Sequence, residues 1–187
     1  MSEATVRFSA DEAQRAWSDW GANCGPGAIA AIAGLTLEEL RPHLGDFERK
    51  KYTNPPLMWQ VLTRLGLAWR LVKPPQSWPT YGLARVQWEG PWTAPGVPMR
   101  VRYRHTHWVG ARDNHSDGPV RFEPPYATEI FDINCICVGG WVPVSEWAGQ
   151  VVPWLLRQIE PKADGRWHLT HVVEVGRSAG DPGRTGA

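Results

Sequence analysis

Cys24 opens the stretch of this chain whose residue types are best suited to chemistry. Gly25 and Pro26 follow it, and an almost wholly apolar run from Ala28 leads to Gly34. Proline fits within a first helical turn, where its missing N–H has no intrahelical partner, and glycine is a typical helix stop. The pattern predicts a buried helix with Cys24 at or beside its N-cap. There the helix dipole and the unpaired N–H groups favour the thiolate, which is the form that attacks carbonyl carbon.

A cysteine nucleophile needs a base, and the base needs an orienting group. Without such partners Cys24 would be interpreted as a small core residue, because free cysteine is often buried. His105 and His107 lie two apart in a predicted strand and so project from the same face. Asp132 and Asn134 share one face of the next predicted strand, and either can accept the proton on the far imidazole nitrogen. The sequence therefore supplies the parts of a catalytic triad.

The elements that must position these residues change character along the chain. Capping residues and helical periodicity predict helices in the first third, at 11–20, 24–33, 36–44 and 57–65. After residue 66 the chain consists of short strand-like runs separated by Pro and Gly. These runs predict strands at 67–72, 83–88, 99–112, 120–122, 129–134 and 167–175. A late helix is expected from residue 145, bent at Pro153. Helices first and strands afterwards predict a single α+β domain over 1–175, with a disordered polar tail at 176–187.

The composition is that of an ordinary globular domain. Of the 187 residues 42% are hydrophobic and 21% are charged, and the formal net charge of +1 indicates no particular partner. The 12 tryptophans predict large aromatic surfaces in the core or along a cleft. Trp20, Trp108 and Trp141 are the candidates for lining a cleft, although Trp141 could instead seal the core. His168 and His171 are expected to have structural roles, although one of them could lie near the site.

The cysteine count and the N-terminus bear on the compartment. Residues 1–8 do not have the pattern of a secretory signal, and no apolar stretch approaches the roughly 20 residues that span a bilayer. Three cysteines make an odd count, and Cys135 lies too close to Cys137 for an ordinary disulfide. We therefore expect a cytoplasmic protein without a membrane partner. A protein delivered by a virion or a dedicated secretion machine would have the same features.

Three motifs in chain order resemble the papain-like cysteine peptidase superfamily. They are Cys-Gly-Pro at a predicted helix start (24–26), His-Trp on a predicted strand (107–108) and Asp132 on the next one. Within the superfamily, the sequence is most similar to the bacterial double-glycine leader peptidases and their stand-alone relatives. The resemblance covers roughly residues 17–140.

This resemblance implies a papain-like fold, in which a helical half presents the cysteine and an antiparallel sheet presents the histidine and the aspartate. It implies Cys24 as the nucleophile, His107 as general base and later general acid, and Asp132 as the orienting carboxylate. His107 is chosen over His105 because of the Trp that follows it, and His105 and Asn134 are kept as auxiliary candidates. The implied reaction is hydrolysis of a peptide or isopeptide bond in a peptide or protein substrate, through a thioester and without a cofactor.

Two other functions fit the same residues. The thioester could be captured by other nucleophiles, so the triad could perform deamidation, transamidation or acyl transfer. A catalytically weak member would instead be a binding or structural module with a peptidase fold, for example in a phage-type assembly.

The sequence departs from the family pattern in one respect. Those peptidases usually carry a Gln several residues before the Cys, whose side-chain N–H helps to hold the oxyanion. Here the nearest such residue is Gln14, ten positions before Cys24. The main-chain N–H of Cys24 can supply one donor, and Gln14, Ser18, Asn23 and the Trp20 indole are the candidates for the second. Asn23 could instead only cap the helix.

Zinc binding is an alternative interpretation of one histidine pair and one cysteine pair. His105, His107, Cys135 and Cys137 could supply four ligands from adjacent strands. Their i, i+2 spacing is not that of a Cys-x-x-Cys knuckle, however, and we expect no metal.

A basic segment has two interpretations. Arg100, Arg102, Arg104 and Arg121, together with Tyr103, could bind nucleic acid or an acidic peptide. A solvated strand face explains the same pattern, and we expect no nucleic-acid partner. The sequence carries no indication of oligomeric state.

Overall fold

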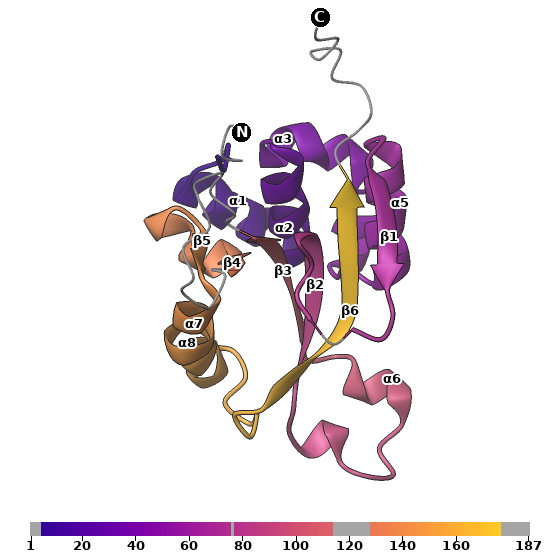
Figure 1. Ribbon diagram of the computed structural model, residues 1–187, viewed down its shortest axis with the longest axis vertical. Coiled ribbons are helices and arrows are strands. Elements are labelled where there is room, and N and C mark those ends of the chain that lie inside the picture. Colours follow the sequence, from indigo (N-terminus) through magenta and orange to yellow (C-terminus); the bar gives the residue numbers. More distant parts are fainter. Residues whose placement is uncertain (1–4, 76, 114–127, 177–187) are drawn as a thin grey trace, which may run out of the picture.

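An antiparallel sheet with helices on both faces forms the frame of the molecule (Figure 1). The computed structural model describes residues 5–75, 77–113 and 128–176. Its strands are β1 Ala68–Val72, β2 Tyr81–Trp88, β3 Thr106–Asp113, β4 Thr128–Phe131, β5 Trp141–Pro143 and β6 Trp167–Gly176. Over these described residues the sheet has six strands in the order β1-β6-β2-β3-β4-β5, and every neighbouring pair is antiparallel. The α+β class expected from the sequence is confirmed.

Two of the N-terminal helices begin with a capping box. Ser9 and Glu12 form one capping box, and Thr36 and Glu39 form another. The helices are α1 Ala10–Trp20, α2 Cys24–Ala33, α3 Leu37–Leu40, α4 Phe47–Lys50 and α5 Pro55–Arg64, and the 3₁₀ turn η1 Arg41–His43 continues α3. The four helices expected in this part of the chain are confirmed, whereas α4 was not predicted.

The strand predicted at 99–112 is wrong in its first half. Met99–Arg102 is a short helix, α6, and β3 begins only at Thr106. Thr106 is opposite Gln87, next to the end of β2 at Trp88. The Trp88 N–H still donates to the carbonyl of His105 at 3.0 Å, but further back the main chain bonds locally, as from the Val101 N–H to the carbonyl of Pro98 at 2.9 Å. The alternating pattern of 99–102 therefore does not produce a strand.

The strand predicted at 129–134 also ends early, at Phe131. Asp132 is instead the N-cap of the 3₁₀ helix η3, Ile133–Val138, and its carboxylate accepts the main-chain N–H of Asn134 at 3.0 Å. An aspartate that binds the main chain two residues ahead favours a turn over a strand. The chain therefore leaves the sheet at Asp132, and Asp132 and Asn134 do not share a strand face.

The helical segment after β5 has an irregular middle. It consists of α7 Val144–Glu146, the π-helical turn η4 Trp147–Val151 and α8 Val152–Gln158. Pro153 lies in the first turn of α8, so the bend expected there takes the form of the π-helical turn before it. A further 3₁₀ turn, η2 Pro91–Thr93, follows β2.

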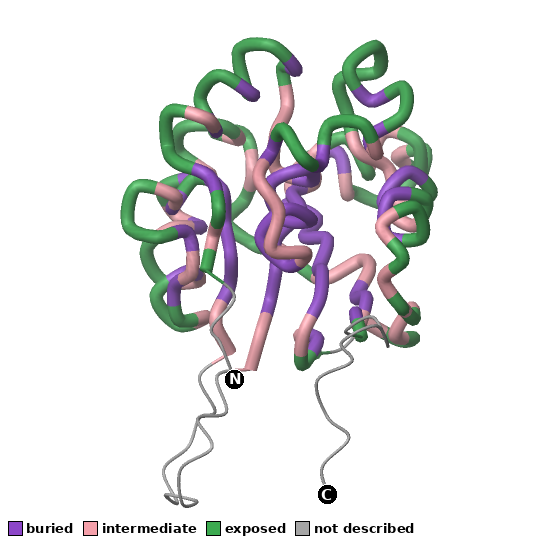
Figure 2. The backbone as a smooth tube through the Cα atoms, turned by 90° about the horizontal axis from the view of Figure 1, so that it is seen from above, coloured by how far each residue is buried: buried purple, intermediate pink, exposed green. Residues whose placement is uncertain are grey.

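Each face of the sheet is covered by its own hydrophobic core. Leu83 of β2 and Trp108 of β3 pack with the N-terminal helices, whereas the next residues, Ala84 and Val109, pack with Trp147 on the other face. Adjacent residues of a strand point to opposite faces, so each strand serves both cores. Buried backbone accordingly runs through the centre of the molecule, with exposed segments around it (Figure 2).

Glycines allow α2 to lie close to both β3 and η3. A methyl group at Gly27 would lie 2.6 Å from Cδ1 of Ile133, and one at Gly110 would lie 3.2 Å from Cγ2 of Ile32. Both distances are shorter than the optimal separation of about 3.5–4.0 Å between carbon atoms. The close approach fixes the position of α2, and with it Cys24, relative to the sheet.

Two sequence expectations fall on residues outside the described ranges. They are the strand at 120–122 and the tail from residue 177, whereas Gly176 is the last residue of β6. Within the described ranges, none of the helices is both long enough and apolar enough to cross a membrane.

Candidate active site

The site forms where β4 ends beside β3. The two strands pair only as far as Gly110 opposite Phe131, so the edge of β3 at His107 and Trp108 is left without β4 as a partner. Cys24 is the first residue of α2, and its thiol hydrogen-bonds to His107 and accepts the main-chain N–H of Trp108. The open edge of β3 thus receives the thiol.

Asp132 lies on the other side of the imidazole. Nε2 of His107 is 2.9 Å from Oδ2 of Asp132, and the indole N–H of Trp147 donates to the same oxygen at 2.9 Å. Oδ1 accepts the main-chain N–H of Asn134 at 3.0 Å and its side-chain amide at 2.8 Å. The carboxylate is completely buried. Four donors therefore hold it in one orientation.

The hydrogen bond to Asp132 determines which nitrogen of His107 faces the thiol. A carboxylate only accepts, so Nε2–H donates to it and Nδ1 is left for Cys24. The His107 side chain is only 10% exposed, and its ring stacks on Trp88, with ring centroids 6.1 Å apart and planes at 22°. The ring is thus held between a thiol and a carboxylate.

Cys24, His107 and Asp132 shift one another's pKa values. Burial alone would raise the pKa of Cys24, but the hydrogen bond and charge of His107 outweigh it and hold the pKa of this thiol below its ordinary value. Burial alone would lower the pKa of His107, but the charge and hydrogen bond of Asp132 raise it to about 10. Burial alone would raise the pKa of Asp132 too, yet the charge of His107 and the hydrogen-bond donors around the carboxylate lower it to about 2. These shifts favour the ion pair of thiolate and imidazolium over the neutral thiol and imidazole.

The other two thiols are in different settings. Cys135 is buried, and burial followed by the charge of Asp132 raises its pKa to about 12. Cys137 is exposed on η3. A nucleophilic thiolate is therefore expected at Cys24 and not at Cys135.

The candidates for the second oxyanion donor are mostly engaged elsewhere. Gln14 and Ser18 are exposed on α1, and the Ser18 hydroxyl donates to the carbonyl of Gln14 at 3.0 Å. The amide of Asn23 donates to the carbonyl of Ala13 at 3.0 Å, so it ties α1 to α2 and does not cap α2. The Trp20 indole is in the core. The structure does not bring these side chains to the thiol.

Cys24 opens onto a cleft of about 930 Å³. Thr53, Arg85, Trp108 and His171 line it together with Cys24. Burial, followed by the nearby charge of Arg85, lowers the pKa of His171 to about 4, so this histidine is neutral at neutral pH. Of the two histidines of the last strand, His171 is therefore the one that lies near the site, which was the alternative to a structural role.

Of the three tryptophans expected along a cleft, Trp108 lines this one and the other two lie elsewhere. Trp20 packs edge-on against Phe47, with ring centroids 5.8 Å apart. Trp141 packs edge-on against Phe131 at 5.7 Å and covers the core. Trp20 thus belongs to the core, and the guanidinium of Arg112 lies over the Trp141 ring, 4.3 Å from its centre.

His105 is not part of the site. It precedes β3, and its Nδ1 lies 2.7 Å from Oε2 of Glu160, while its ring stacks on Trp92 at 3.7 Å. His105 and His107 thus contact different carboxylates, and Cys137 is exposed. Within the described part of the chain, no group of three or more His, Cys, Asp and Glu side chains could hold a metal ion.

The structure adds residues that sequence reasoning missed. Trp147 was not connected to the site, yet its indole N–H binds Asp132. Thr53 packs against Gly25, and its carbonyl accepts the indole N–H of Trp108 at 3.2 Å. The glycine after the cysteine was the only signal of this close approach.

Comparisons with protein-family models, with curated proteins and with solved structures found no match for this chain. The geometry of the site therefore carries the functional conclusion.

Proposed function

We propose that this protein is a thiol-dependent amide hydrolase, a cysteine peptidase that acts on a peptide or isopeptide bond. The observation that carries the proposal is the single buried imidazole of His107, which bridges the Cys24 thiol and the Asp132 carboxylate. A thiol in that setting is a nucleophile at neutral pH, and the imidazolium beside it is a proton donor.

A papain-like architecture is part of the proposal. Its support is a helical layer that carries the thiol at the start of α2 and an antiparallel sheet that carries His107. The order Cys, His, Asp along the chain also supports it, as does the separate turn that presents Asp132 to the far side of the ring.

In the acylation step, the Cys24 thiolate attacks the carbonyl carbon of the amide, and a C–S bond forms. As the tetrahedral intermediate collapses, the C–N bond breaks and the imidazolium of His107 gives its proton from Nδ1 to the leaving amine. Asp132 keeps the ring oriented by accepting from Nε2 throughout. The products are the free amine and a thioester on Cys24.

In the deacylation step, the now neutral imidazole takes a proton from water as the water oxygen attacks the thioester carbonyl. The C–S bond then breaks, which releases the carboxylic acid and restores the thiolate and imidazolium. No electrons are gained or lost over the cycle, and no cofactor is required.

The start of α2 supports stabilisation of the oxyanion. The main-chain N–H of Cys24 lies in the first turn, where N–H groups have no intrahelical acceptor. Thr53 is packed directly against Gly25 and held there by its contact with Trp108. Its hydroxyl is therefore our candidate for the second donor, in place of the glutamine of the family pattern.

Selective alkylation tests the nucleophile. Iodoacetamide at pH 6 should label Cys24 rapidly and stoichiometrically, as measured by mass spectrometry of the cysteine-containing peptides. Substitution His107→Ala should abolish this selectivity, because burial then dominates and raises the thiol pKa. Equal and slow labelling of Cys24 and Cys137 in the wild type would refute the proposal.

Product analysis tests the reaction. Extracts incubated with the wild type should contain new peptide termini that are missing after incubation with Cys24→Ala. Conversion of glutamine to glutamate without new termini would instead identify a deamidase that uses the same thioester.

A further inference from the structure

We propose that the substrate carries a carboxylate near the bond that Cys24 attacks, and that Arg85 binds this carboxylate. The inference rests on the proposed function, because it concerns the molecule on which the thiolate acts. The observation behind it is a buried arginine inside the cleft that has no acidic partner among the described residues.

Arg85 lies at the centre of the sheet, on the face that the cleft occupies. It stands on β2 opposite Trp108 of β3 and opposite His171 of β6. Directly opposed residues of antiparallel strands place their side chains on the same face. Arg85, Trp108 and His171 all line the cleft that contains Cys24.

The contacts of this guanidinium leave part of its donor capacity unused. Nη2 donates to the carbonyl of Tyr103 at 3.3 Å and to Oγ1 of Thr106 at 3.0 Å. The guanidinium carbon lies 5.5 Å from the Tyr103 ring centre and 5.9 Å from that of Trp108. Nε is buried and has no hydrogen-bond partner among the described residues. The aromatic rings therefore hold the group in place while its fork remains available for an acceptor.

An unpaired buried charge is costly, and Arg85 is only 6% exposed. Several of the other described arginines have carboxylate partners, for example Arg7 with Glu39, Arg41 with Glu48, Arg112 with Glu129 and Arg166 with Asp164. The carboxylates of these four pairs are all more exposed than Arg85. The charge that most needs a counterion is thus the one inside the cleft.

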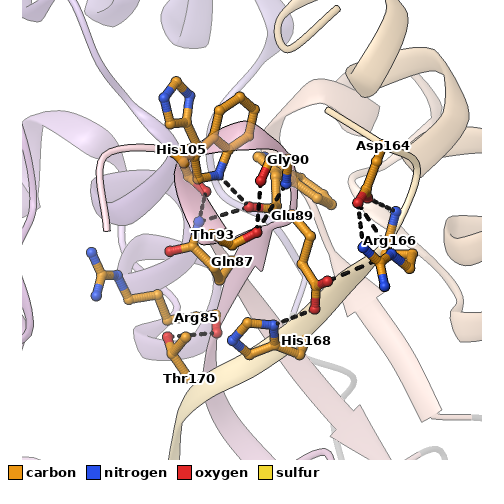
Figure 3. A network of polar contacts seen from close by, with 12 residues as sticks. Arg85, Gln87, Glu89, Gly90, Thr93, His105, Asp164, Arg166, His168 and Thr170 are labelled. Atoms are coloured by element: carbon orange, nitrogen blue, oxygen red, sulfur yellow. Dashed lines mark hydrogen bonds and ion pairs between the residues drawn. The ribbon is translucent and has the colours of Figure 1, made fainter. Parts of the chain in front are cut away.

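The acidic cluster just after the end of β2 does not serve Arg85. The carbonyl of Arg85 accepts the hydroxyl of Thr170 at 3.2 Å, but its guanidinium points away from the cluster around Glu89 (Figure 3). Glu89 itself contacts His168 at 2.9 Å and Arg166 at 3.6 Å. The cluster is satisfied without Arg85.

The mouth of the cleft has the same sign of charge. Lys51, Arg100 and Arg104 are exposed along it, and no Asp or Glu lines the cleft among the described residues. The formal net charge of the chain is only +1, so this positive lining is local. Such a cleft attracts an anionic substrate and repels a cationic one. Part of the basic segment seen in the sequence therefore belongs to the cleft, on a helix and a turn instead of a strand.

The anionic group of a peptide is a carboxylate, from an Asp or Glu side chain or from a free C-terminus. A guanidinium binds either one through paired N–H···O bonds. Arg85 could alternatively act on Cys24 alone, because its charge lies within reach of the thiolate. The two roles are separable, since a purely electrostatic effect on the thiolate changes its reactivity toward every reagent.

Paired alkylating reagents separate these roles. Iodoacetate and iodoacetamide both lose iodide to a thiolate, but only iodoacetate brings a carboxylate. The rate constants for Cys24 are measured for each reagent by peptide mass spectrometry, and the exposed Cys137 serves as the internal reference. We expect the iodoacetate to iodoacetamide ratio to be higher at Cys24 than at Cys137.

Substitution Arg85→Met removes the charge and keeps an unbranched apolar side chain between the two aromatic rings. We expect the ratio at Cys24 to fall by about tenfold, the scale of one charge-assisted hydrogen bond in a partly buried site. Arg85→Lys should retain part of the preference. Arg157→Met, on the exposed face of α8, is the control with the same change in net charge.

The outcomes distinguish the two proposals. An unchanged ratio in Arg85→Met, or an equal fall of both rates, would overturn the carboxylate proposal while leaving the nucleophile proposal standing. A wild-type Cys24 that reacts no faster than Cys137 with either reagent overturns both. If Arg85→Met does not fold, the wild-type ratio decides, and a value equal to that of Cys137 overturns the inference.

Small blocked peptides identify the source of the carboxylate. N-acetyl-aspartyl amide offers a side-chain carboxylate, and N-acetyl-glycyl-glycine offers a free C-terminus. Each is compared with its neutral counterpart, the asparagine amide or the diglycine amide, in protecting wild-type Cys24 from iodoacetamide. Protection by one acid and not by its neutral counterpart supports the proposal and names the source. Equal protection by acids and neutral compounds would contradict it.

Discussion

The indole N–H of Trp147 lies 2.9 Å from Oδ2 of Asp132, the same oxygen that accepts from His107. Trp147 begins a π-helical turn on the far side of the sheet from α2 and is completely buried. A chain of hydrogen bonds thus runs from this core residue through Asp132 and His107 to the Cys24 thiol.

Substitution Trp147→Phe should keep most of the packing and remove this donor. We expect the free energy of unfolding to fall by about 2 kcal/mol, because a buried carboxylate loses one hydrogen bond. Urea denaturation measures the change. Trp154→Phe is the matched control, since Trp154 is 44% exposed on α8. Equal effects of the two substitutions would contradict a special role for the indole N–H.

The contribution of the His107–Asp132 pair to the free energy of unfolding should decrease at both the acid and the alkaline end of the pH range. The pKa of Asp132 is lowered, so its contribution is present above its ordinary pKa of 3.8 and is lost as pH falls through about 2. The pKa of His107 is raised, so its contribution is complete below its ordinary pKa of 6.5 and is lost as pH rises through about 10.

Substitution Asp132→Asn should therefore be most destabilising between these ordinary values, by about 3 kcal/mol, since it leaves a buried imidazolium without its counterion. The difference from the wild type should shrink toward acid pH and toward alkaline pH. Urea denaturation of both proteins at several pH values measures it. A difference that is constant across the pH range would show that the carboxylate and imidazole are not ionised together.

Substitution Thr53→Val tests the second oxyanion donor. It should lower the rate at which p-nitrophenyl acetate acylates Cys24, relative to the rate of alkylation by iodoacetamide, by at least about tenfold. Acylation passes through an oxyanion and alkylation does not. The measurements are p-nitrophenol release and peptide mass spectrometry, with Thr63→Val on α5 as the control. An unchanged ratio would remove Thr53 from the proposed mechanism.

Substitution Gly25→Ala should disturb the start of α2. The new methyl group would lie 2.8 Å from Cβ of Thr53 and would collide with its hydroxyl. We expect a loss of about 2 kcal/mol in the free energy of unfolding, as for other overpacked sites, together with slower alkylation of Cys24. Gly149→Ala is the control, because nothing lies within 4 Å of the added methyl group there. Equal unfolding free energies would refute the steric argument.

The local elements were predictable because their signals are local. Thr36 and Asn54, for example, each cap a helix as their residue types indicate. The errors occur where pairing with a neighbouring strand decides whether a segment becomes a strand. Residues 99–102 lack a partner strand, and the Asp132 side chain binds the main chain of Asn134. Alternation of residue types does not reveal whether a neighbouring strand exists.

The sequence by itself determined the helix that carries Cys24, the order of the three site residues and the class of the fold. Periodicity and capping chemistry act over a few residues, so they can be read without a structure. The tertiary structure decided which histidine meets the thiol, which tryptophan holds Asp132 and why Arg85 is left without an acidic partner among the described residues. Those contacts join residues far apart in the chain, and they depend on sheet register and on the close approach of α2 that its glycines permit.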